Sequence, residues 1–185
     1  MKEKFEAYLR ELVYGAIDGT VTTFAVVAAA AGAGLGSTIV IILGIANLIG
    51  DGFSMGASAY LAAKSERDLK QRNHNESKAP GEFTHDETPF KDGVITFASF
   101  VVVGFIPILP YVLDAIVGLK MALTDLFLFS IAITAFTFVA VGWLKASVTK
   151  TSRLRAAAET LALGSVAAGV SYILGDLLAR ALGAR

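Results

Sequence analysis

The chain has 185 residues, of which 55% are hydrophobic and only 17% are charged. Its mean hydropathy of +0.63 is too high for an ordinary soluble domain and favours a membrane protein. Sixteen Lys and Arg residues balance sixteen Asp and Glu residues, so there is no basic excess that would bind nucleic acid. The absence of cysteine excludes disulfides, thiolate metal sites and cysteine nucleophiles.

Long apolar segments with few charges alternate with short polar segments along the chain. A hydrocarbon core about 30 Å thick requires about 20 helical residues, and backbone groups inside lipid must be hydrogen-bonded within their own segment. We therefore predict an all-α polytopic membrane protein with a single transmembrane domain over residues 1–185. Its five predicted spans cover about residues 12–33, 38–63, 88–113, 123–145 and 154–182, and a cytosolic loop covers residues 64–91.

Local signals support these spans in chain order. A glycine-rich turn at residues 32–37 separates the first span from the second. Thr88 followed by Pro89 is typical of a helix start, and Pro107 predicts a bend within the third span. A cleaved signal peptide is the alternative for the first span, but three Glu residues before residue 12, and Asp18 inside the apolar segment, argue against it.

The distribution of basic residues predicts the orientation in the membrane. Thirteen of the sixteen Lys and Arg residues belong to the amino terminus, to the 64–91 loop or to the connection between the fourth and fifth spans. Lys120, Arg180 and Arg185 are the three on the opposite side. The positive-inside rule therefore predicts a cytosolic amino terminus and a carboxyl terminus on the other side.

Two carboxylates, Asp18 and Asp51, fall inside the predicted spans. An Asp at the centre of a span costs about 2.5–3.5 kcal/mol on insertion scales, so each needs a partner, a proton or water. Thr20 and Thr22 follow Asp18 closely and are expected to place hydroxyl oxygens beside its carboxylate. The alternative for both acids is a structural hydrogen bond to a neighbouring helix.

Asn47, Asp51 and Met55 are spaced four residues apart and form one stripe on the second span. Oxygen donors alone would suit Mg²⁺ or Ca²⁺, whereas an added thioether favours a borderline ion such as Fe²⁺, Co²⁺ or Ni²⁺. The stripe therefore predicts a transition-metal site. The alternative is that Met55 only fills a gap in the core.

Pairs of small residues four positions apart occur on the same two spans. They are Gly15 with Gly19 and Gly52 with Gly56. Such pairs allow helices to pack closely. We expect them either to bring Asp18 and the Asn47, Asp51, Met55 stripe to one site, with Gly15 and Gly19 on the face where two chains associate, or simply to pack helices together.

Three stretches of the sequence resemble the vacuolar iron transporter family. They are DGTVTTFA at residues 18–25, SMGASAYLAAKSE at residues 54–66 and FIPILPY at residues 105–111. The resemblance implies a homodimer of five-span protomers, with an ion path at the dimer interface lined by Asp18 and Met55. It also implies proton-coupled export of Fe²⁺ or Mn²⁺ from the cytosol by a transporter that is not an enzyme.

The sequence departs from that family in two ways. Many members have a Glu eight residues before the Met, where this chain has Asn47, and the acid here is Asp51 instead. Well-studied members also insert a large cytosolic metal-binding domain between spans two and three, so this chain resembles a shortened member. Glu66 and Asp68 match the family's charged end of span two and are candidates for a cytosolic metal entrance, although Lys70 and Arg72 offer ordinary surface partners.

The residues and the resemblance together predict a divalent-metal/proton antiporter without a cofactor, in the cell membrane of a prokaryote or in the vacuole or another endomembrane of a eukaryote. A carboxylate removed from water favours its protonated form, and a metal displaces that proton when it binds. An uncoupled channel or uniporter and a non-transporting membrane partner subunit are the alternatives. A lipid-modifying enzyme is disfavoured because no histidine lies in a predicted span. His85, Asp86 and Glu87 are expected to form a solvated loop.

Overall fold

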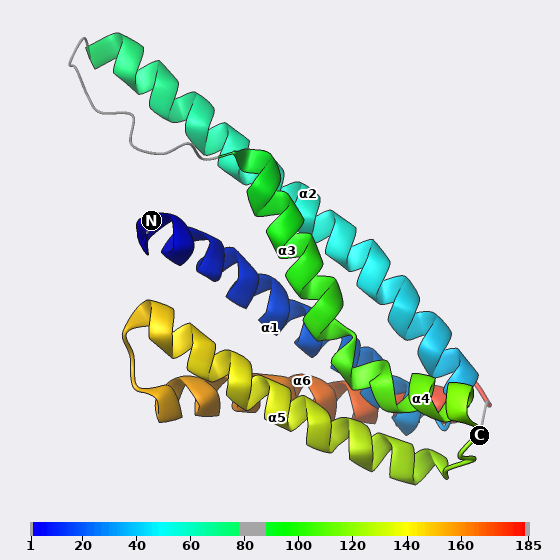
Figure 1. Cartoon of the computed structure of the whole chain (residues 1–185). Coiled ribbons are helices and arrows are strands. Elements are labelled where there is room, and N and C mark those ends of the chain that lie inside the picture. Colours follow the sequence, from blue (N-terminus) through cyan, green and yellow to red (C-terminus); the bar gives the residue numbers. More distant parts are fainter. Residues whose placement is uncertain (1, 78–87, 184–185) are drawn as a thin grey trace.

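The computed structural model describes residues 2–77 and 88–183, and every regular element in them is a helix (Figure 1). The elements are α1 (Lys2–Gly32), α2 (Ser37–Ser77), α3 (Pro89–Gly104), the short 3-10 helix η1 (Ile106–Ile108), α4 (Leu109–Val117), α5 (Leu123–Thr149) and α6 (Arg153–Ala181).

Five helical segments within these residues are long and apolar enough to cross a membrane. They are Tyr8–Gly32, Ser37–Arg72, Pro89–Val117, Leu123–Ser147 and Arg153–Ala181. The third combines α3, η1 and α4. The predicted all-α membrane architecture with five spans is therefore confirmed.

Helix α1 is the centre of the bundle. It contacts α2, α3, α5 and α6, while α2 packs on α3 and α5 packs on α6. Figure 1 shows α1 running between the α2–α3 pair and the α5–α6 pair. The side chains of Val27, Phe100, Ile108 and Leu126 are fully buried between these helices and form the main core cluster. Helix α1 thus has other helices packed against it on two sides.

A tight turn connects α1 to α2. Gly34 has a φ of 72°, in the left-handed region where a residue with a Cβ is strained. The amide of Leu35 donates to the carbonyl of Ala30 at 2.9 Å, which satisfies the last turn of α1. The predicted glycine-rich turn therefore lets the chain reverse within a few residues.

Helix α2 extends beyond the predicted second span, because residues 64–77 of the 64–91 segment are helical. This stretch contains good helix formers, and Glu66 and Lys70 form an i,i+4 ion pair at 2.9 Å. A helix can continue out of the hydrocarbon region when its charged residues lie in water. The first part of the 64–91 segment therefore continues the helix of the second span.

The third span is interrupted at Pro107, as its sequence predicts. Helix α3 ends at Gly104 and η1 follows, because a proline removes one backbone donor and its ring clashes with the preceding turn. Ser130 on α5 donates its hydroxyl to the carbonyl of Pro107 at 2.6 Å. This bond pairs a carbonyl that would otherwise be unsatisfied in the interior.

The small-residue pairs on α1 and α2 pack against α3 of the same chain. A Cβ atom on Gly19 would clash with the backbone carbonyl of Phe100, and one on Gly56 would lie 2.8 Å from the carbonyl of Gly93. Gly15 likewise meets Ser99, and Gly52 meets Phe100. These glycines are therefore contacts within the protomer, so the expectation that Gly15 and Gly19 lie at an interface between chains was wrong. Gly52 and Gly56 behave as the helix-packing alternative predicts.

Candidate functional site

Asp18 lies in the interior of the first span and is half-buried. The hydroxyl of Thr22 donates to the backbone carbonyl of Asp18 at 2.9 Å, and that of Thr20 donates to the carbonyl of Ala16 at 2.7 Å. Both hydroxyls therefore bond to the backbone of α1. Such a bond to the carbonyl four residues earlier is common for a Thr in a helix and uses the proton of each hydroxyl.

The stripe on α2 lies at the boundary between the interior and the outer surface. Met55 is half-buried and packs against the main core cluster. Asn47 is half-buried, and its amide nitrogen is buried without a hydrogen-bond partner among the described residues. Asp51 is exposed on the outside of the protomer. The stripe thus presents a thioether and an amide inward and a carboxylate outward.

Asp18 and Asp51 lie inside two neighbouring spans of the bundle. They belong to different helices, and α1 and α2 contact each other directly. Two acids in neighbouring spans repel each other when both are ionised, and acids inside a span are costly. They are the two residues that the sequence singled out most strongly.

A polar strip continues from Asp51 along the exposed face of α2. Ser54 and Ser58 are also exposed, and nothing lies within 4 Å of the position that a Cβ would take on Gly50. Lipid is a poor neighbour for an ionised carboxylate, at a cost of about 2.5–3.5 kcal/mol near mid-span. This side of the protomer therefore requires water or another polar group.

The protomer alone does not assemble a closed site of the usual metal-binding side chains. Among the residues that the structure describes, no group of three or more His, Cys, Asp or Glu residues could hold an ion together. What the chain places near one point is the pair Asp18 and Asp51, with Asn47 and Met55 one turn to either side on α2. Such a set can bind a cation only when further ligands complete it.

Glu66 and Asp68 lie far from these residues. Glu66 is fifteen residues beyond Asp51 on the same helix, which corresponds to about 22 Å along the helix axis. Glu66 is exposed and paired with Lys70, and Asp68 is exposed as well. This arrangement favours the ordinary surface interpretation. His85, Asp86 and Glu87 lie outside the described residues.

Glu11 is a further acid on α1 that the sequence did not single out. Its side chain is 15% exposed, and its carboxylate accepts a hydrogen bond from the Thr96 hydroxyl at 3.2 Å and pairs with Arg10 at 3.1 Å. Glu11 is seven residues before Asp18, two helical turns away on the same face of α1. The seven-residue spacing from Asp18 is visible in the sequence and could have indicated this position. It places a second carboxylate between Asp18 and the end of the bundle where the chain begins.

Comparison with known proteins agrees with the resemblance that the motifs carry. The model of the VIT family matches residues 9–82 and 74–176. The chain belongs to the VIT family. The two matched segments of this VIT protein overlap at residues 74–82, which begin in the last turn of α2.

Curated relatives of this VIT protein carry matching names. The "Vacuolar iron transporter" of Toxoplasma gondii is 26% identical over 96% of this chain and 76% of that protein. The "Vacuolar iron transporter 1" of Arabidopsis thaliana is 28% identical over 92% of this chain and 86% of that protein. That of Eucalyptus grandis is 43% identical over 60 residues, or 32% of this chain and 24% of that protein. Family membership confirms the prediction of an integral membrane transporter rather than an enzyme.

Proposed function

We propose that this VIT protein carries Fe²⁺ or Mn²⁺ out of the cytosol in exchange for protons. The observation that carries the proposal is the pair of carboxylates, Asp18 and Asp51, that lie inside two neighbouring spans whose helices contact each other. Intramembrane acids are costly and usually mark an ion or proton path. The names of the relatives, which are iron transporters, support the same substrate class.

The transporting unit is a homodimer whose ion path lies between the protomers. Asp51 and the serines that continue its strip are exposed on one protomer, where lipid would be an unfavourable neighbour. A two-fold axis beside α2 would place the same strip of a second copy opposite the first. Each ion would then meet up to four carboxylates, two from each chain, in place of the pair that one chain supplies.

The ligands match a borderline divalent ion. Asp18 and Asp51 supply carboxylates, Asn47 an amide oxygen and Met55 a thioether sulfur. Carboxylates alone would serve a hard ion such as Mg²⁺ equally well, whereas sulfur adds affinity for softer ions. Asn47 has an amide nitrogen without a partner among the described residues, so its amide group is free to turn its oxygen toward the path.

Proton exchange follows from the same acids. In the proposed cycle, these acids hold the exchanged proton while no metal is bound. A metal ion binds only deprotonated ligands, so its entry releases that proton. The charge moved across the membrane in each cycle is thereby reduced.

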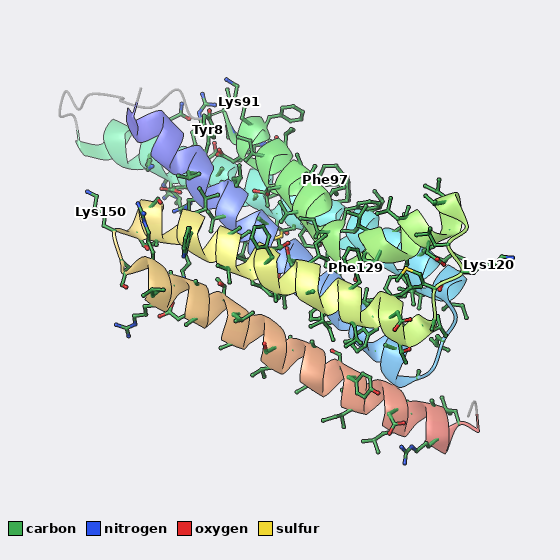
Figure 2. All side chains as sticks on the ribbon, turned by 60° about the horizontal axis from the view of Figure 1, so that its bottom comes forward. Tyr8, Lys91, Phe97, Lys120, Phe129 and Lys150 are labelled. Carbon is green, nitrogen blue, oxygen red and sulfur yellow. The ribbon has the colours of Figure 1, made fainter. Side chains whose placement is uncertain are left out.

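The charges at the two ends of the bundle support the orientation in the membrane that this proposal assumes. Figure 2 shows Lys91 and Lys150 at the same end as Tyr8, and Lys120 at the opposite end. The positive-inside rule makes the end that holds Tyr8 the cytosolic one. Glu11 lies two turns from Asp18 toward this end, which suits a residue that passes cations from the cytosol to the path.

Transport into proteoliposomes tests this function directly. The purified full chain is reconstituted with a metal-sensitive dye and a pH-sensitive dye inside, and Fe²⁺, Mn²⁺, Co²⁺ and Zn²⁺ are compared with protein-free vesicles. Metal entry accompanied by proton exit supports the antiporter. Metal entry without proton movement would establish the uncoupled channel or uniporter. The absence of metal entry would favour the alternative of a non-transporting partner subunit.

A further inference from the structure

An apolar groove of about 430 Å³ opens on the outer surface between α2 and α3. Its walls include four aromatic side chains, those of Phe53, Tyr60, Phe90 and Phe97. Phe53 is 71% exposed and Phe90 is 70% exposed. Aromatic side chains that stand apart on a membrane-facing surface leave a slot that is open to lipid.

Two glycines form the floor of the groove. A Cβ atom on Gly93 would lie 2.7 Å from the carbonyl oxygen of Gly56, and one on Gly56 would lie 2.8 Å from the carbonyl oxygen of Gly93. The two backbones are therefore already in contact, and the helices cannot move closer to close the slot. The groove is a fixed consequence of this glycine pair and its aromatic neighbours.

The groove is on a different side of α2 from the ion site. Phe53 is two residues after Asp51, which turns it by about 200° around the helix axis. Ala57 and Tyr60, which also line the groove, continue the Phe53 side at positions i+4 and i+7. The residues of the groove are therefore different from those of the strip that contains Asp51, Ser54 and Ser58, to which the ion path is assigned.

Two lysines stand at one end of the groove. Lys64 is one turn beyond Tyr60 on α2, and Lys91 is two residues before Gly93 on α3. Tyr60 and Gly93 are in contact and the two helices run in opposite directions, so both lysines belong to the same end. Both are exposed, and Figure 2 shows Lys91 at the end of the bundle that holds Tyr8, with Phe97 further along α3.

We propose that the groove binds an acyl chain of an anionic phospholipid, and that Lys64 and Lys91 bind its phosphate. The apolar slot and the two exposed ammonium groups at its end match the two parts of such a lipid, in the leaflet at the amino-terminal end of the bundle. A second copy of the chain with the same orientation in the membrane is a poorer occupant, because it would bring a further pair of these lysines to the same end. The bound lipid would hold α2 against α3 next to the ion site.

Lipid binding to the purified full chain tests the charged end of the site. Native mass spectrometry and thermal melting are recorded with phosphatidylglycerol and with phosphatidylcholine. The double variant Lys64→Gln, Lys91→Gln is expected to lose about fivefold in phosphatidylglycerol affinity for each lysine, with phosphatidylcholine binding unchanged. The matched control Lys150→Gln, Arg153→Gln removes two exposed charges at the same end and is expected to keep the preference.

A second variant tests the apolar part. Ala57→Trp fills the slot and is expected to remove one bound molecule of either lipid, while glycerol phosphate without acyl chains gives no shift in melting temperature. The proposal is overturned if the double lysine variant keeps the preference of the wild type, or if the control loses it equally. Loss of the dimer in Ala57→Trp with lipid binding intact would show that a second copy occupies the groove and would also overturn it.

Discussion

Gly19 of α1 lies against the backbone of Phe100 in α3, with no room for a Cβ atom between them. Gly52 of α2 meets the same phenylalanine from the other side, where a Cβ atom would lie 3.2 Å from the ring carbon Cδ1. Asp18 and Asp51 are the residues immediately before these two glycines. Phe100 therefore sets the separation of the two helical turns that carry the acids.

The first prediction compares the two glycines. Gly19→Ala is expected to lower the free energy of unfolding by about 1–3 kcal/mol, because the atom that a Cβ meets belongs to the backbone and cannot turn away. Gly52→Ala is expected to cost less, since its neighbours are side-chain atoms of Phe100 and Val101 that can shift by a few tenths of an ångström. Thermal melting in detergent measures both.

A glycine on α6 provides the control for this comparison. Nothing lies within 4 Å of the position that a Cβ would take on Gly169. Gly169→Ala is expected to be neutral or to stabilise by up to about 1 kcal/mol through helix propensity. Equal melting temperatures for Gly19→Ala and Gly169→Ala would contradict the packing described for Phe100.

The sequence predicted the helices well because their signal is local. Uncharged runs of about 20 residues have few alternatives to a membrane-spanning helix. Pro107 interrupts the third span because proline lacks the backbone N–H that a helix needs. The pairing of helices is a different matter. A glycine pair indicates that a helix approaches closely at that point, but it carries no information about which helix, and α3 proved to be the partner of both α1 and α2.

Side-chain directions at the site were equally hard to predict. Asp18 and Asp51 could be singled out because an acid in lipid is costly wherever it points. The hydroxyls of Thr20 and Thr22 bond to carbonyls of their own helix, a choice that depends on rotamers rather than on spacing. Glu11 lies near the end of the span, where placing an acid costs little free energy. The insertion cost therefore gave no reason to single it out.

The second prediction concerns membrane orientation. A reporter inserted after Lys78 is expected in the cytosol and one fused after Arg185 on the other side, because thirteen of the sixteen basic residues belong to one side. A reporter after Lys120 serves as the control and is expected to match the carboxyl-terminal fusion. Protease accessibility or a compartment-specific enzyme tag reads out each fusion. A cytosolic carboxyl terminus would rule out the proposed orientation.

The third prediction concerns the choice of ion. Met55→Leu keeps an apolar side chain of similar size but removes the thioether, so transport is expected to fall more for Fe²⁺ and Co²⁺ than for the harder Mn²⁺. Initial rates of metal entry into proteoliposomes measure the ratio. Met121→Leu, at an exposed position between α4 and α5, is the matched control and is expected to leave the ratio unchanged. An equal loss for all ions would make Met55 a packing residue only.

The last prediction separates coupling from structure at the two acids. Asp51→Asn removes a negative ligand and a proton acceptor while keeping the size of the side chain, and a neutral amide is easier to bury than a carboxylate. Metal-dependent proton movement is therefore expected to disappear while the protein stays folded, and Asp18→Asn is expected to behave alike. Asp125→Asn, which changes an exposed acid at the start of α5, is the control and is expected to keep both fluxes.

Thermal melting with and without metal completes this test, because a ligand that binds only the folded state raises its melting temperature, and by more when it binds more tightly. The wild type and Asp125→Asn are expected to be stabilised by Fe²⁺ or Mn²⁺, whereas Asp18→Asn and Asp51→Asn lose most of that shift. If Asp51→Asn transports metal with intact proton counterflow, its carboxylate only bonds a neighbouring group. The coupling proton would then belong to Asp18 or to Glu11, and Glu11→Gln, assayed in the same two ways, decides between them.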